Sequence, residues 1–216
     1  LANEKNLILA EAMTIYNMPI YAELESVISS GRLGEMRLVQ VNFGSFKEYD
    51  MTNRFFNMNL AGGALLDIGV YALSLVRMFM ETQNAHISSQ VKFAETGADE
   101  QSSIIIKNGK EQMASVTLSL HSKQPKRATI CFDNAYIEIF EYPRAEKALI
   151  TYTEDGHTEE ITAGRLQDAL YYEIVNTEQS VIMGKNRMHL DYTADVMNVM
   201  TELRRQWNMK YPEERE

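Results

Sequence analysis

Asp67 and Tyr71 are the residues of this chain whose types and spacing are best suited to chemistry. They lie four positions apart, just after the adjacent glycines Gly62 and Gly63. In a helix, a carboxylate and a phenol at this spacing share one face and can act together on a substrate hydroxyl. Adjacent glycines before a helix let the backbone approach a ligand or another element closely. The alternative is structural: a first-turn acidic residue and a core tyrosine.

The segment 45–60, which leads to the glycines, mixes polar, aromatic and charged side chains without a clear period. This composition is typical of a loop that lines a site. The guanidinium of Arg54 in this loop can hold substrate hydroxyls or a carboxylate near Asp67. A surface ion pair between Arg54 and Glu48 or Asp50 is the alternative.

The elements that position these residues follow from hydrophobic periodicity. Apolar residues at helical spacing predict helices over about 17–31, 63–80, 166–183 and 190–209. Alternation predicts a strand at 35–43, and alternating segments separated by turn signals between 85 and 162 predict a largely antiparallel sheet of six or more strands. The continuous apolar run at 7–10 is typical of a strand buried on both faces. The expected fold class is α+β, an open sheet with helices packed on one face.

The other face of this sheet carries mixed small, polar and apolar side chains. Along residues 113–121, Ala, Val and Leu alternate with Ser, Thr and His. Such a face is either solvated or packed against a copy of itself in a two-fold dimer. Flanking Ile, Met and Tyr residues favour the homodimer.

Composition excludes several classes of function. The 216 residues carry a formal net charge of −9, without the clustered Lys and Arg that nucleic-acid binding needs. The apolar run at 65–80 is interrupted by Asp67 and Arg77, which argues against a membrane span. The single Cys131 cannot form an intramolecular disulfide and fits a cytoplasmic protein. The four histidines lack metal-site spacing, so no metal is expected.

Several segments together resemble one family. Residues 60–71, the Glu-Ala-Met of 11–13, the helix that starts at Pro19 and the Gly-Arg-Leu-Gly of 31–34 resemble the Gfo/Idh/MocA oxidoreductases. Within that family the chain is most similar to the dihydrodiol dehydrogenase and xylose dehydrogenase branch. The resemblance implies an NAD(P)-dependent dehydrogenase made of an N-terminal Rossmann domain and a C-terminal open-sheet domain of the glyceraldehyde-3-phosphate dehydrogenase type.

The resemblance also implies a domain assignment for this chain. Residues 14–216 would form the C-terminal substrate-binding and dimerisation domain. Residues 1–13 would be the remnant of the nucleotide-binding domain, namely a helix end and its last strand. The rest of that Rossmann domain, with the family's catalytic lysine, would lie upstream of Leu1. NAD or NADP would therefore be bound mainly outside this chain, and the 216 residues alone would be inactive.

Roles for individual residues follow from the same resemblance. Asp67 and Tyr71 would be catalytic, with Tyr71 at the position where most of the family has His, as in the dihydrodiol branch. The implied substrate-binding residues are Arg54, Phe55, Gly62 and Gly63. Glu11 would face the cofactor or serve an interdomain structural role.

The implied reaction is hydride transfer between a CH-OH group and the nicotinamide cofactor. The substrate would be a small sugar, polyol or diol. Thr14 stands where the dihydrodiol branch typically has Trp, which favours a smaller polyol or sugar over an aromatic diol. The alternative function is a non-catalytic sugar-binding or dimerisation module.

Overall fold

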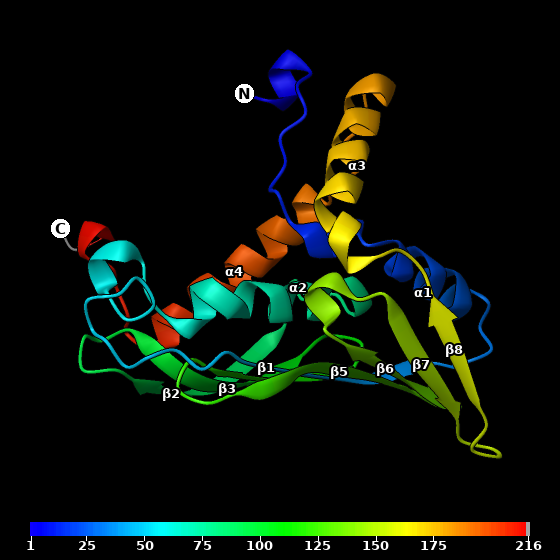
Figure 1. The fold of residues 1–216 in the computed structure, drawn as a ribbon, viewed down its shortest axis with the longest axis horizontal. Helices are drawn as coiled ribbons and strands as arrows, with labels where there is room; N and C mark the ends of the chain where they lie inside the picture. Colours follow the sequence, from blue (N-terminus) through cyan, green and yellow to red (C-terminus); the bar gives the residue numbers. More distant parts are fainter. Residues whose placement is uncertain (215–216) are drawn as a thin grey trace.

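An eight-stranded sheet forms the base of the computed structural model, which describes residues 1–214 (Figure 1). The strands are β1 (Met36–Gly44), β2 (His86–Phe93), β3 (Asp99–Lys107), β4 (Met113–Ser119), β5 (Gln124–Phe132), β6 (Ala135–Phe140), β7 (Lys147–Tyr152) and β8 (Thr158–Thr162). Their order in the sheet is β2-β3-β4-β1-β5-β6-β7-β8. The pairing of β1 with β4 is parallel and the other pairings are antiparallel. The expected open, largely antiparallel sheet is confirmed.

Helices lie on one side of this sheet (Figure 1). The α-helices are α1 (Pro19–Ser29), α2 (Val70–Phe79), α3 (Ala169–Met183) and α4 (Leu190–Gln206). Pro19 starts α1 because its missing N–H needs no partner at a first helical position. Gly184 ends α3 in the left-handed region, with φ 61°, where glycine has no steric cost. The predicted helices and the α+β class are therefore confirmed.

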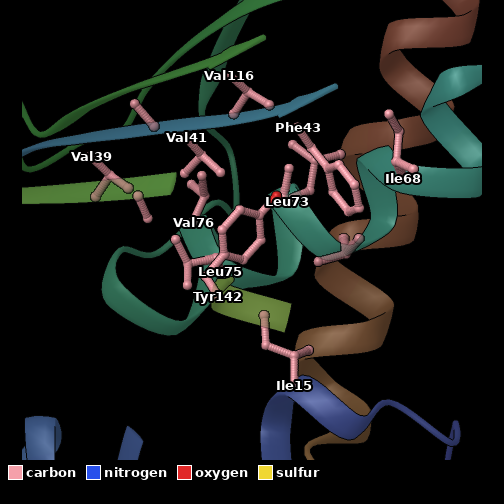
Figure 2. Close-up of a cluster of buried hydrophobic side chains, with 14 of the residues drawn as sticks. Ile15, Val39, Val41, Phe43, Ile68, Leu73, Leu75, Val76, Val116 and Tyr142 are labelled. Carbon is pink, nitrogen blue, oxygen red and sulfur yellow. The ribbon is translucent and has the colours of Figure 1, made fainter. Parts of the chain in front are cut away.

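The core lies between the sheet and α2 (Figure 2). Val39, Val41 and Phe43 point from β1 toward the helices, as their alternation predicts, and all three are buried. Leu73 and Val76 of α2 are also buried in this cluster. Residues 58–79 are long and apolar enough to pass for a membrane span, but 61% of their most apolar window is buried within the protein. The apolar character of this segment is thus that of a core helix.

The first residues differ from the sequence-based expectation. A short 3-10 turn covers Asn3–Lys5, and residues 7–13 have no regular secondary structure. Leu7 and Leu9 are 61% and 55% exposed. A strand exists only when a neighbour accepts and donates its backbone hydrogen bonds. Within residues 1–214 none of the eight strands pairs with this segment, so the apolar run at 7–10 is not a strand here.

Candidate functional site

The adjacent glycines make a turn that is packed tightly against the protein itself. A Cβ on Gly62 would lie 2.8 Å from the Asn57 nitrogen and 2.9 Å from the Arg54 carbonyl oxygen. Gly63 has φ +132°, and a Cβ there would lie 2.0 Å from Oδ1 of Asp99. Both glycines therefore allow close approach of neighbouring protein atoms, which fixes the start of the helix that carries Asp67.

Asp99 is the buried acid behind this turn. Its Oδ2 accepts a hydrogen bond of 2.7 Å from the Leu65 N–H, as an N-cap side chain does at the start of a helix. Asp99 is fully buried, and burial raises the pKa of its carboxyl to about 7. The sequence analysis missed this residue because it lies 34 positions from its hydrogen-bond partner. The available signal was an acidic pair, Asp99 and Glu100, at the start of strand β3.

The C-terminal segment closes the same turn from another side. The phenol of Tyr211 donates a hydrogen bond of 2.9 Å to the Gly62 carbonyl oxygen. The guanidinium of Arg204 lies 4.7 Å from the centre of the Tyr211 ring. The turn is thus held by β3 and by the end of the chain.

Arg54, Phe55 and Asp67 lie together, as the sequence analysis expected for Arg54 and Asp67. Asp67 belongs to a π-helical turn over Leu65–Gly69 that precedes α2. The Arg54 Nη2 is 3.0 Å from Asp67 Oδ1, and its guanidinium carbon lies 4.3 Å from the centre of the Phe55 ring. The Arg54 side chain is 65% exposed and that of Asp67 17% exposed. The loop arginine therefore pairs with Asp67 and leaves part of its fork of donors open to solvent.

Tyr71 lines a separate cavity of about 310 Å³. The lining residues are Thr14, Phe43, Tyr71, Lys126, Glu141, Pro143, Arg144 and Leu166. Asp67 is not among them, so the structure gives the two residues of the motif different surroundings. The Phe43 and Tyr71 ring centres are 6.5 Å apart. A cavity of this size that combines aromatic and charged side chains is suited to a small polar molecule.

The segment 11–16 reaches this region from the N-terminal side. Thr14 is buried and contributes to the wall of the Tyr71 cavity. Glu11 is half-buried, and it lies near enough to Tyr16 for its charge to add to the burial that raises the pKa of that phenol to about 12. Tyr16 donates a hydrogen bond of 2.7 Å to Ser74. Glu11 therefore lies near Tyr16 and is not one of the residues that line the Tyr71 cavity.

A larger cavity, of about 710 Å³, lies among α1, α3 and the segment 185–192. None of the site residues expected from the sequence lines it. His189 and Tyr192 stack there with ring centres 4.7 Å apart, and the Tyr16 ring packs tilted or edge-on against them at 5.8 and 5.7 Å. Within residues 1–214 no group of three or more His, Cys, Asp or Glu side chains is placed to hold a metal ion.

Comparison with protein families gives a match over more than half of the chain. The GFO/IDH/MocA C-terminal domain matches residues 21–138, which include the Arg54 loop, the glycine turn, Asp67 and Tyr71. The matched segment also contains Asp99 and Lys126.

Curated relatives include trans-1,2-dihydrobenzene-1,2-diol dehydrogenases. The chain is 25% identical over 220 residues to that of Xenopus tropicalis, covering 98% of this chain and 66% of the relative. It is 33% identical over 123 residues to that of Sus scrofa, covering 56% of this chain and 36% of the relative. The chain thus spans less than two thirds of the length of these relatives.

Solved structures share the fold at low sequence identity. A variant of a 3-ketoreductase from Actinomadura kijaniata, in complex with TDP-benzene and NADP, aligns with a TM-score of 0.78 at 15% identity, over 94% of this chain and 64% of that chain. An aldose-aldose oxidoreductase from Caulobacter crescentus, complexed with glycerol, aligns with a TM-score of 0.77 at 16% identity, over the same shares.

Proposed function

Because this chain belongs to the GFO/IDH/MocA family through its C-terminal domain, we propose that it is the substrate-binding part of an NAD(P)-dependent oxidoreductase. The whole protein would transfer a hydride between a CH-OH carbon of a sugar, polyol or diol and the nicotinamide. The names of the dihydrodiol dehydrogenase relatives support oxidoreduction of a small hydroxylated molecule. The 216 residues alone are expected to bind neither NAD nor NADP strongly and to show no turnover.

The observation that carries this proposal is the Tyr71 cavity at the start of α2. The phenol of Tyr71 can donate or accept the proton of a substrate hydroxyl in a cavity of about 310 Å³. Asp67 lies one turn before Tyr71, at the start of the helix, where it adds negative charge. Its carboxylate is 3.0 Å from the Arg54 guanidinium. A bound nicotinamide would supply the hydride chemistry. The sequence of this chain contains no glycine-rich loop of the dinucleotide-binding kind, so its residues would mainly hold the substrate.

A nucleotide-binding domain is expected to pack against α3 and residues 1–13. Helix α3 exposes large apolar side chains, namely Leu170, Tyr171, Ile174, Val181, Ile182 and Met183. Helix α3 and the N-terminal segment both project from the sheet layer in the same direction (Figure 1). Exposed apolar groups in this number are typical of a surface that another domain or subunit covers. This supports assigning residues 1–13 to the nucleotide-binding domain and residues 14–216 to the C-terminal domain.

Tyr71→Phe in the protein that includes the nucleotide-binding domain is expected to lower kcat by about 10²-fold or more. The phenol oxygen is lost while the ring that packs near Phe43 is kept, so folding should be preserved. Steady-state kinetics with circular dichroism would measure both. Tyr152→Phe on β7, outside the cavity, is the matched control, because it also removes one phenol oxygen and keeps the ring. An unchanged kcat would contradict the catalytic role and favour a non-catalytic sugar-binding or dimerisation module.

We also propose that the open face of the sheet forms a homodimer interface. Register places Ile105, Ser115, Gln40 and Thr129 in one row across β3, β4, β1 and β5. Ile105, Met113 and Phe140 on this face are 40%, 41% and 45% exposed. A sheet face with apolar groups distributed among small polar ones suits an isologous contact, in which the same surface meets itself.

Ile105→Glu is expected to convert the dimer to a monomer. The new carboxylates of the two copies would repel each other, and each would lose its hydration when the interface forms. Sedimentation velocity would measure the mass at several protein concentrations. Phe46→Glu, which changes an exposed apolar residue of a loop, should leave the mass unchanged. A wild-type monomer across the micromolar range would disprove the dimer.

A further inference from the structure

The Tyr71 cavity has a local charge opposite in sign to that of the protein. The whole chain carries a net charge of −9, but the charged residues that line this cavity are Lys126, Arg144 and Glu141. Lys126 Nζ lies 3.0 Å from Glu141 Oε2, so these two charges largely neutralise each other. The excess positive charge of the cavity belongs to Arg144.

Arg144 is free to bind an anion. Among residues 1–214 its guanidinium makes no ion pair within 4.0 Å, and the acid that its charge acts on is Glu173. Burial raises the pKa of the Glu173 carboxyl, and the positive charge of Arg144 opposes this rise. A guanidinium has a planar fork of donors that matches the two oxygens of a carboxylate or a phosphate.

The turn that carries Arg144 is held rigidly. Glu141 adopts the left-handed region with φ 49°, and its N–H donates to the Lys126 carbonyl oxygen at 2.7 Å. The Arg144 N–H donates to the Glu141 carbonyl oxygen at 2.9 Å. Between them, the fully buried Tyr142 packs edge-on against Phe43, with ring centres 6.1 Å apart. Left-handed backbone at a residue other than glycine costs free energy and concentrates at binding sites.

We propose that Arg144 binds an anionic group at one end of the substrate while a substrate hydroxyl lies at Tyr71. The substrate class is then a small hydroxylated molecule with a carboxylate or phosphate, such as a sugar acid or a sugar phosphate. The ion pair of Lys126 and Glu141 would bind substrate hydroxyls that lie between the anionic group and the hydroxyl at Tyr71. This inference rests on the proposed function, because it takes the Tyr71 cavity as the substrate site.

Binding of matched neutral and anionic ligands tests the proposal. Calorimetric titration would compare glucose, gluconate and glucose 6-phosphate. One of the two anions should bind with a Kd at least tenfold lower than that of glucose. The identity of that anion distinguishes recognition of a carboxylate from recognition of a phosphate. Raising the salt concentration should weaken anion binding and leave glucose binding unchanged. Arg144→Gln should lose the preference by about tenfold or more. Arg205→Gln, an exposed arginine of α4, should keep it.

The outcomes separate this inference from the proposed function. Equal Kd values for glucose and both anions, or an Arg144→Gln variant that keeps the preference, would overturn it. Arg144→Lys, which keeps the charge but not the fork, should retain part of the preference and guards against a folding defect in the glutamine variant. The proposed function is tested independently by the kcat of Tyr71→Phe, and it can stand when the anion preference fails.

Discussion

Gly63→Ala is expected to lower the free energy of unfolding by roughly 3–5 kcal/mol. The new Cβ would lie 2.0 Å from Oδ1 of Asp99, and the backbone at this position has φ +132°. Asp99 cannot move aside, because it is fully buried and holds the Leu65 N–H at 2.7 Å. The substitution therefore combines backbone strain with a steric clash against the residue that caps the helix. Urea unfolding of wild type and variant would measure the difference.

Two other glycines provide matched controls for this experiment. Gly97 also has a positive φ, +89°, but a Cβ there meets nothing within 4 Å, so Gly97→Ala isolates the backbone cost. Gly109 has open space around it and no positive φ, so Gly109→Ala should be close to neutral. A Gly63→Ala variant no less stable than Gly97→Ala would show that Asp99 does not constrain the turn.

The sequence predicted those parts of the fold that depend on local patterns. Alternation placed Val39 and Phe43 on the core face of β1, and turn signals after residue 85 correctly indicated a largely antiparallel sheet. The parallel pairing of β1 with β4 could not be read from either strand, since it joins residues such as Val41 and Val116 far apart in the sequence. For the apolar run at 7–10, the prediction of a strand was wrong, because a strand-like composition does not supply a partner strand.

Only those parts of the candidate site that lie within one segment of the chain could be predicted from the sequence. The sequence analysis expected Arg54 to lie near Asp67, and the structure joins the two at 3.0 Å, while their roles in binding and catalysis stay predictions. The cavity around Tyr71 escaped the sequence analysis because Lys126 and Arg144 come from elements that only the folded sheet brings together. Local periodicity carries no information about which charges will face one another across such a cavity.

Asp99 is expected to make the stability of this protein fall as pH rises from about 5 to 7. Burial raises its folded-state pKa to about 7, whereas the same carboxyl in the unfolded chain titrates near 3.8. Between these values the folded protein keeps a proton that the unfolded chain has released, so the free energy of unfolding decreases with pH and levels off above about 7. A shift of this size corresponds to at most about 4 kcal/mol.

Asp99→Asn isolates this contribution, because an amide does not titrate. Comparison with the variant is needed since burial lowers the pKa of His189, which gives wild-type stability a slope of opposite sign at mildly acidic pH. Urea unfolding at pH 5, 6, 7 and 8 should show that the stability advantage of wild type over Asp99→Asn shrinks up to about pH 7 and then levels off. Asp133→Asn, at an exposed carboxylate whose pKa Arg37 lowers, should leave the slope unchanged over this range. Parallel pH curves for wild type and Asp99→Asn would mean that Asp99 is already ionised in the fold. The glycine turn would then be capped by a buried charge rather than by a neutral acid.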